Sequence, residues 1–301
     1  MAQQIRCFTS ESRIAVVAAG RLGSSLAQAL RVAHYPVVAI SSRRSAHRDW
    51  LAGRLPAATV YETPAEAAAR ADIVFITAPD SAVAEVCAGI GWQPGQAAIH
   101  CAGVLPLSAL GGAKSRGAVT GGLHPLQTFP SPDATSRLRG ITFAVESADP
   151  DLSGWLADVA QALGGKPLEI SGGQRAAYHA SAVMSSGLLA GLIGLAAEMW
   201  QDLGVPRERA LANLLPLIES TVSAVREQGI PSALTGPYVR GDAATVAKHL
   251  EATSARSPEM GVAYAALALA ALPIAAEQGG LSPGDRAAIE KLLRERLREG
   301  I

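Results

Sequence analysis

The chain has 301 residues, of which 49% are hydrophobic and 17% are charged. This length predicts two domains, and the apolar fraction is sufficient for a large core. Lys plus Arg and Asp plus Glu each number 26, so the formal net charge is zero. A nucleic-acid-binding protein normally carries a basic excess or a basic stripe. The sequence therefore favours a small molecule over a nucleic acid as the partner.

The cysteines are few and widely spaced: Cys7, Cys87 and Cys101. An odd number without metal-ligand spacing argues against a disulfide framework and a metal site, and favours the cytoplasm. The polar N-terminus lacks the apolar segment of a signal peptide. Two apolar segments, Ala182–Met199 and Val262–Ala276, are interrupted by Ser and Gly or are too short to cross a membrane. We expect buried helices there and no membrane partner.

The first half of the chain alternates short β-branched segments with Ala-rich ones, which is typical of βαβ units. The predicted strands are 13–17, 36–40, 58–61, 72–78, 97–101, 141–145 and 167–170, with helices over 22–33 and 152–163. The strands are short and apolar, as in a parallel sheet covered on both faces. This pattern predicts a Rossmann domain with a doubly wound, mostly parallel sheet.

After Gly172 and Gly173 the strand pattern ends and helical periodicity begins. The predicted helices are 174–203, 207–228, 243–252, 259–278 and 283–299, separated by Gly- and Pro-containing breaks. The fold class is therefore α/β, with a Rossmann domain over residues 1–172. An all-helical domain follows over residues 173–301.

A glycine turn follows the first predicted strand. The dinucleotide fingerprint is GxGxxG, and its three positions are Ala18, Gly20 and Gly23. The second glycine allows close approach of the pyrophosphate, and the third allows the helix to pack on the strand. Alanine can take the first position if φ there is negative. The predicted phosphate-binding residues are Ala18, Ala19, Gly20, Arg21, Leu22 and Gly23.

The end of the second predicted strand indicates which nicotinamide cofactor binds. An NAD site usually has Asp or Glu about 20 residues after the fingerprint, hydrogen-bonded to the ribose 2′-hydroxyl. This chain has Ser41, Ser42, Arg43 and Arg44 instead. No carboxylate repels a 2′-phosphate there, and guanidinium groups bind phosphate strongly. The sequence therefore predicts NADP(H).

Several blocks of the chain resemble the 6-phosphogluconate-dehydrogenase-like superfamily, which includes pyrroline-5-carboxylate reductase and ketopantoate reductase. The blocks are Asp72–Asp80 with Ser81–Val83, His100–Gly103, Gly122–Phe129, Tyr178–His179 and Ala233–Asp242. They are most similar to a branch with a Rossmann-like domain and a C-terminal domain of unknown function. The resemblance implies the fold, the cofactor class and a homodimer formed through the helical domain, but no substrate.

The chain departs from this branch at two positions. A Lys commonly stands where this chain has Arg175, and an Asn often stands where it has Gly187. If those residues transfer protons in relatives, the chemistry here is altered or other groups perform it.

In an open α/β sheet, ligands bind beyond the carboxyl ends of the strands. The residues that we expect to line the nicotinamide site are Ala78, Pro79, Asp80, Val83, Cys101, Ala102 and Gly103. Hydride transfer to a carbonyl or imine leaves a heteroatom that needs a proton, so a positioned acid is expected.

One helical face near the start of the second half carries polar groups that suit this chemistry. Arg175, Tyr178 and His179 stand at i, i+3 and i+4 and share that face. If the face lines an interdomain cleft, Arg175 would hold a substrate carboxylate. His179, or Tyr178 as the alternative, would then donate the proton, because histidine titrates near neutral pH.

Three further residues are catalytic candidates. His100 lies at a predicted strand end and is equally compatible with a structural role, whereas His124 precedes Pro125 in a strand-to-loop segment, where a structural role is favoured. Arg240 precedes Asp242, which we expect to cap the following helix, and would reach the substrate or a dimer partner.

The first functional hypothesis is an NADP(H)-dependent reductase of a small 2-oxo acid or cyclic imine. The substrate rests on fold-level analogy alone. The alternative is a non-catalytic NADP(H)-binding sensor, because the branch's Lys and Asn are absent here. The polar groups retained around the expected cleft favour the enzyme.

Overall fold

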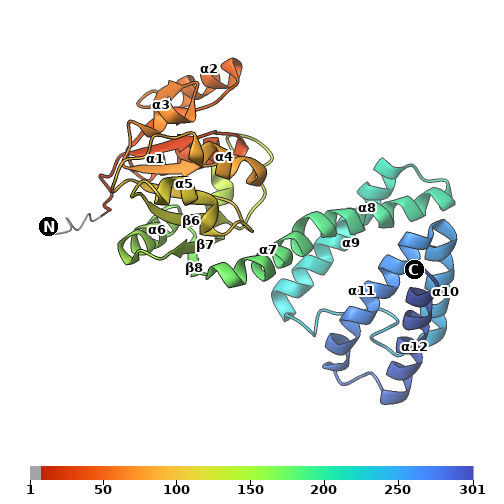
Figure 1. Cartoon of the computed structure of the whole chain (residues 1–301). Helices are drawn as coiled ribbons and strands as arrows, with labels where there is room; N and C mark the ends of the chain where they lie inside the picture. The colour runs from red at the N-terminus through yellow and green to blue at the C-terminus, as the bar shows by residue number, and fades with distance from the viewer. Residues whose placement is uncertain (1–7, 301) are drawn as a thin grey trace. The chain divides into compact units, whose positions relative to one another are not determined.

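The computed structural model describes residues 8–300 (Figure 1) and consists of two compact units, which divide between Ser186 and Gly187. The first unit is α/β and the second is helical, which confirms the predicted fold class. The sequence changes from strand patterns to helical periodicity at residue 172, before this division, because helix α7 (Arg175–Val183) packs with the first unit. Cys7 lies outside the described residues.

A single eight-stranded sheet forms the centre of the first unit. In chain order its strands are β1 (Ile14–Val17), β2 (Val37–Ser41), β3 (Thr59–Tyr61), β4 (Ile73–Ile76), β5 (Ala97–His100), β6 (Val119–Pro125), β7 (Thr142–Ser147) and β8 (Lys166–Glu169). The spatial order is β3-β2-β1-β4-β5-β6-β7-β8, and only the β6–β7 pair is antiparallel. The first six strands therefore have Rossmann topology, and their carboxyl ends share one edge.

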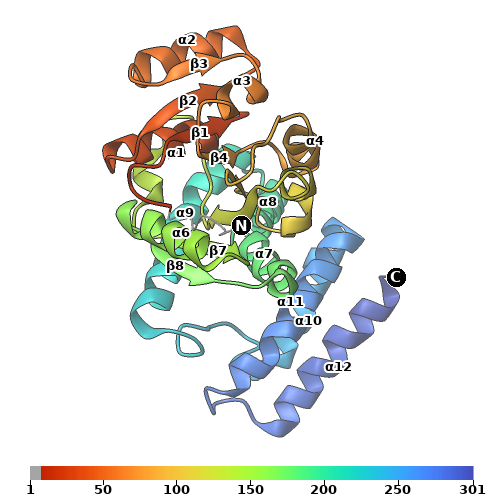
Figure 2. The same cartoon turned by 60° about the vertical axis from the view of Figure 1, so that its left-hand side comes forward.

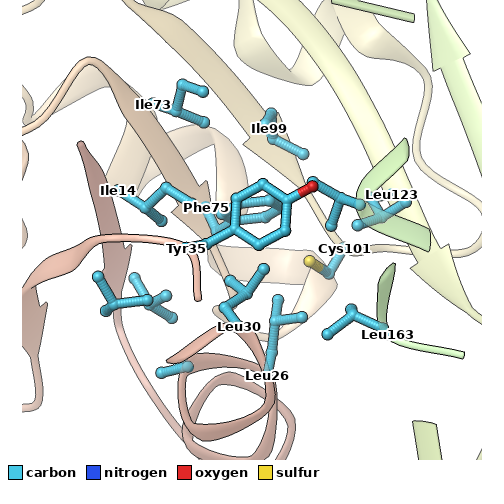
Figure 3. Close-up of a cluster of buried hydrophobic side chains, with 14 of the residues drawn as sticks. Ile14, Leu26, Leu30, Tyr35, Ile73, Phe75, Ile99, Cys101, Leu123 and Leu163 are labelled. Carbon is cyan, nitrogen blue, oxygen red and sulfur yellow. The ribbon is translucent and has the colours of Figure 1, made fainter. Parts of the chain in front are cut away.

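Alternating side chains of the central strands build two cores, one on each face of the sheet. Ile14 and Phe75 pack with Leu26 on the face covered by α1 (Arg21–Val32) and α6 (Pro150–Ala162) (Figure 3). Val17 and its neighbours on the opposite face pack under α3 (Pro64–Ala68), α4 (Val83–Ala88) and α5 (Gly111–Lys114). Strands β1 and β4 are apolar and buried at every position because both faces of the sheet are covered there.

Seven α-helices lie in the described part of the first unit. They are α1 (Arg21–Val32), α2 (Ser45–Arg54), α3 (Pro64–Ala68), α4 (Val83–Ala88), α5 (Gly111–Lys114), α6 (Pro150–Ala162) and α7. The α6 helix begins with a residue pair that favours helix starts: the Asp149 side chain accepts from the Leu152 N–H, and Pro150 occupies the first turn.

The second unit contains α8 (Leu189–Met199), α9 (Arg207–Gln228), α10 (Ala243–Arg256), α11 (Pro258–Ala276) and α12 (Pro283–Glu299). Helices α10, α11 and α12 lie side by side around a small apolar core that includes Val246, Leu272 and Leu293 (Figure 2). Asp242 caps α10 by accepting from the Thr245 N–H, which confirms its predicted role.

The helix that starts the second half is continuous from Gly172 to Leu203, with a π-helical turn at Met184–Leu188. This helix and α11 are long and apolar enough to cross a membrane by length and composition alone. Only 6% of the apolar window of the first helix is buried, so the burial that the sequence predicts for 182–199 is not found.

Candidate functional site

The glycine turn joins β1 to α1 as the sequence predicts. A Cβ on Gly20 would meet no protein atom within 4 Å, so open space lies where a pyrophosphate would approach. A Cβ on Gly23 would collide with the Thr77 hydroxyl, so the close packing of α1 requires glycine there. Ala18 has φ of +54°. The condition under which alanine replaces glycine without strain is therefore not met, and Ala18 adopts a left-handed conformation.

Ser41 holds this turn in place. Its carbonyl oxygen accepts from the Ala19 N–H at 2.8 Å, and its hydroxyl accepts from the Ala18 N–H at 3.1 Å. Because the Ser41 side chain is buried, its contribution to a cofactor site is to shape the turn.

Beyond Ser41 the chain presents two exposed guanidinium groups, those of Arg43 and Arg44. Arg48 donates to the Ser42 carbonyl at 3.0 Å and to the Arg43 carbonyl at 2.8 Å, which fixes the loop that carries them. His47 joins this group, since its Nε2 lies 3.0 Å from the Ser24 hydroxyl of α1. His47 was not predicted from the sequence. Its position three residues after Arg44, in the first turn of α2, is the feature that could have indicated it.

The carboxyl ends of β4 and β5 lie at the same sheet edge as the glycine turn. Ala78 is half-buried there and Pro79 and Asp80 are exposed, so all three border the expected nicotinamide position. Two other residues predicted to line the nicotinamide site have side chains that lie in the cores instead. Val83 is fully buried in one core, and the Cys101 sulfur points into the other core (Figure 3).

A cluster of aromatic and imidazole side chains gathers around Gly103. The Tyr178 hydroxyl lies 2.8 Å from Nδ1 of His124. A Cβ on Gly103 would lie 3.0 Å from Nε2 of His124 and would collide with the ring of His179. The predicted residues His124, Tyr178 and His179 therefore meet at the end of β5.

Burial controls the charges of this cluster. It lowers the pKa of His124 to about 4, with further lowering by the neighbouring His179 and Arg175. Burial likewise lowers the pKa of His100 to about 4 and raises the pKa of Tyr178 to about 12. All three groups are consequently uncharged at neutral pH.

Arg175 is buried and paired, in contrast to the substrate-binding role expected from the sequence. Its side chain is 1% exposed, and its Nε donates to the Glu146 carboxylate. One terminal nitrogen donates to the Ala102 carbonyl at 3.1 Å, and the other is buried against Gly122. This geometry assigns Arg175 to positioning the 102–103 turn, because no part of the guanidinium reaches the surface.

His100 and Arg240 are the two remaining catalytic candidates. The His100 side chain is fully buried, so it does not reach a substrate. Arg240 is an exposed residue of the second unit, and its role stays a prediction. The sequence also gave no indication of Glu146, which lies in a β-strand and has no recognisable motif around it.

A pocket of about 330 Å³ adjoins the imidazole cluster in the first unit. Its polar lining consists of His124, Gln127, Thr128, His179, Ser181, Ser185 and Ser186. Leu126, Ala182 and Val183 complete the lining. The π-helical turn of Met184–Leu188 contributes Ser185 and Ser186, and such turns often occur at functional sites.

Two protein families match the chain. Residues 4–125 match the family described as Rossmann-like domain, and residues 141–271 match the family described as domain of unknown function, DUF2520. No curated protein matches the chain.

Solved structures of reductases share the fold. A candidate NADP oxidoreductase from Bacteroides fragilis is 26% identical, with a TM-score of 0.72 over 88% of this chain and 99% of its own. A 1-pyrroline-5-carboxylate reductase from Streptococcus pyogenes is 17% identical, with a TM-score of 0.58 over 96% of this chain and 100% of its own.

A reductive aminase from Aspergillus terreus, in complex with NADPH and ethyl levulinate, is 19% identical, with a TM-score of 0.56 over 96% of this chain and 95% of its own. Such likenesses at low identity establish the architecture. Residues 4–125 are therefore similar to the Rossmann-like family and residues 141–271 to the DUF2520 family, and the chain shares its fold with these solved structures.

Proposed function

We propose that the chain is an NADP(H)-dependent oxidoreductase that transfers a hydride between the cofactor and a small carbonyl or imine compound. The observation that carries the proposal is the cluster of His124, Tyr178 and His179 around Gly103. This cluster lies at the sheet edge that also presents the glycine turn. Reductases that share the fold bind NADP(H), which supports the same cofactor here.

The residues at the edge fit the parts of NADP(H). The N–H groups at the start of α1 would bind the pyrophosphate over Gly20. Arg43 and Arg44 would bind the 2′-phosphate, and the loop has no carboxylate at residues 41–44 to repel it. When bound, the cofactor supplies the hydride.

The imidazole cluster would orient the substrate heteroatom and supply its proton. If the Tyr178 hydroxyl donates to Nδ1 of His124, the neutral ring carries its proton on Nε2, which faces Gly103. That N–H would donate to the carbonyl or imine heteroatom and orient it. His179 lines the adjoining pocket, and we assign to it the proton that this heteroatom needs after reduction.

The test is NADPH oxidation, followed by absorbance, with a panel of ketones and cyclic imines. We expect His179→Ala to lower kcat about 10²- to 10⁴-fold, the usual contribution of a general acid, with unchanged NADPH affinity. His34→Asn is the control, because His34 is exposed on a distant turn and asparagine tolerates its positive φ. No oxidation with any member of the panel, or unchanged turnover of His179→Ala, would contradict the proposal.

We further propose that the helical residues 173–301 pair two copies of this cytoplasmic protein and help to bind the substrate. Large apolar side chains are exposed on α8 and α9, among them Leu192 at 43% and Leu217 at 64%. Exposed apolar surface of this kind often marks an interface. Light scattering should give twice the chain mass of 30.9 kDa, and Leu217→Glu should shift the protein toward the monomer. A monomeric wild type would contradict the pairing.

A further inference from the structure

Among the described residues, none that lines the 330 Å³ pocket beside His124 and His179 is Lys, Arg, Asp or Glu. We infer that this pocket takes an uncharged carbonyl or imine substrate that carries hydroxyl groups, and that it excludes 2-oxo acids. The inference rests on the proposed reductase function and names the substrate class of that same site.

The nearest buried cation is unable to bind a substrate carboxylate. Arg175 forms an ion pair with Glu146, and its NH1 donates a hydrogen bond to the Ala102 carbonyl. The arginine is 1% exposed, so a substrate in the pocket would not reach it. A carboxylate in this pocket would therefore find no arginine or lysine to pair with, and the one positive charge near it would be the proton on His179.

The lining offers hydrogen bonds that suit hydroxyl groups. Ser181 donates its hydroxyl to the Tyr178 carbonyl at 2.7 Å, and Ser186 donates to the Ala182 carbonyl at 2.6 Å. Because both protons are engaged, the two serine oxygens are left as acceptors. An acceptor repels a carboxylate oxygen but binds a substrate O–H.

Gln127 supplies a matching donor. Its side-chain oxygen accepts from the Thr128 N–H at 2.9 Å, which leaves the amide NH₂ to donate. A hydroxyl group both donates and accepts, so it satisfies Gln127 and the serine oxygens together. A site built to hydrogen-bond a substrate hydroxyl rejects analogues that lack it.

Arg137 is the one cation whose side chain reaches a lining residue among the described contacts. Its NH1 lies 3.4 Å from the Thr128 hydroxyl, and the residue is exposed to solvent. An exposed guanidinium at this distance is solvated and offers an acid little affinity. Substitution of Arg137 is therefore the control: it shows whether any binding of an acid depends on this guanidinium at the rim of the pocket.

The reaction is an ordinary two-electron reduction. The hydride of NADPH forms a C–H bond at the carbonyl carbon while the C=O π bond breaks, and its electron pair moves to oxygen. The oxygen takes the proton assigned to His179, so ketone, NADPH and H⁺ give alcohol and NADP⁺. No charge other than that of the proton enters the pocket.

Dihydroxyacetone and hydroxypyruvate form a matched pair of probes, because they differ in one CH₂OH that is replaced by a carboxylate. Binding to the full-length protein with NADP⁺ is measured by saturation-transfer NMR at concentrations up to about 10 mM, above the usual range of Michaelis constants. We expect dihydroxyacetone to bind at least about tenfold more tightly than hydroxypyruvate, because hydroxypyruvate lacks one of the two hydroxyl groups that the lining can bind. Gln127→Ala should weaken dihydroxyacetone binding, whereas Arg137→Gln should leave it unchanged.

Tighter binding of hydroxypyruvate, or binding of neither probe, would overturn the inference. Loss of hydroxypyruvate binding in Arg137→Gln would reveal an acid site at the rim and would also overturn it. NADPH oxidation is recorded separately with both probes. Selective binding of dihydroxyacetone without any oxidation would support the pocket's specificity while counting against the reductase function.

Discussion

Ala18 stands where the dinucleotide fingerprint has its first glycine, and it adopts φ of +54°. Alanine in the left-handed region costs roughly 1–2 kcal/mol, partly offset by the greater freedom that glycine has in the unfolded chain. Ala18→Gly should therefore raise the free energy of unfolding by about 0.5–1 kcal/mol in denaturant titrations. Ala19→Gly is the matched control, because Ala19 lies in the core without a positive φ and should lose stability. A lower free energy of unfolding for Ala18→Gly would contradict this account, because it would show that the Ala18 methyl group stabilises the turn.

Glu146 is the sole carboxylate paired with the buried Arg175 among the described ion pairs. Removing one partner of a buried pair leaves the other charge uncompensated and typically costs about 3–5 kcal/mol. We expect this loss for Glu146→Gln in thermal or denaturant unfolding. Glu169→Gln changes an exposed glutamate on the neighbouring strand β8 and should change stability little. Equal stabilities of the two variants would mean that Arg175 does not depend on Glu146.

His100 and His124 both have a pKa of about 4 because of burial, well below the usual value near 6.5. The unfolded chain therefore binds more protons below pH 6.5, so stability is fully present above that pH and falls as the pH decreases toward 4. Histidine-selective NMR should show the rings of His100 and His124 still neutral at pH 5. Protonation of both rings near pH 6.5 would contradict the buried cluster.

At the scale of elements, the sequence predicts long and well-capped helices best. The bounds expected for 207–228 and 283–299 agree with α9 and α12. Strong capping explains α12, because Ser282 accepts from the Asp285 N–H and Pro283 follows. Helices α3 to α5 have too few turns to show a period, and α2 buries only Leu51, so no apolar pattern predicts these helices.

Strand β6 was harder to predict, for a packing reason. Gly121 and Gly122 interrupt its apolar pattern, yet both are required by their neighbours. A Cβ on Gly121 would press on Leu156, and a Cβ on Gly122 would collide with Arg175. The Glu146–Arg175 pair was missed likewise, since it depends on contacts across 29 residues that no local pattern encodes.

The start of α11 provides a test at this scale. Ser257 caps the helix by accepting from the Met260 N–H at 3.1 Å, with Pro258 in the first turn. Loss of such a cap typically costs about 1 kcal/mol, so Ser257→Ala should lower the unfolding free energy of the helical unit by that amount. Ser257→Asp keeps an acceptor and should retain wild-type stability. Equal losses in both variants would show that the hydroxyl cap is not what stabilises α11.

At the scale of the whole molecule, the alternation of strands and helices and the later helical pattern predicted the α/β unit and the helical unit correctly. The motif residues His124, Tyr178 and His179 were also found from the sequence, and the structure brings them together. Burial was not accessible from the sequence, and it changes the interpretation of Arg175 and His100.

The central claim is that the Rossmann-like domain binds NADP(H), and calorimetric titration of the protein with NADPH and with NADH tests it most directly. The account predicts tight NADPH binding, with NADH at least about tenfold weaker because it lacks the phosphate that Arg43 and Arg44 would hold. The double variant Arg43→Ala, Arg44→Ala should weaken NADPH binding and leave NADH binding nearly unchanged. Equal affinities in the wild type would refute the phosphate site, and binding of neither dinucleotide would contradict the account as a whole.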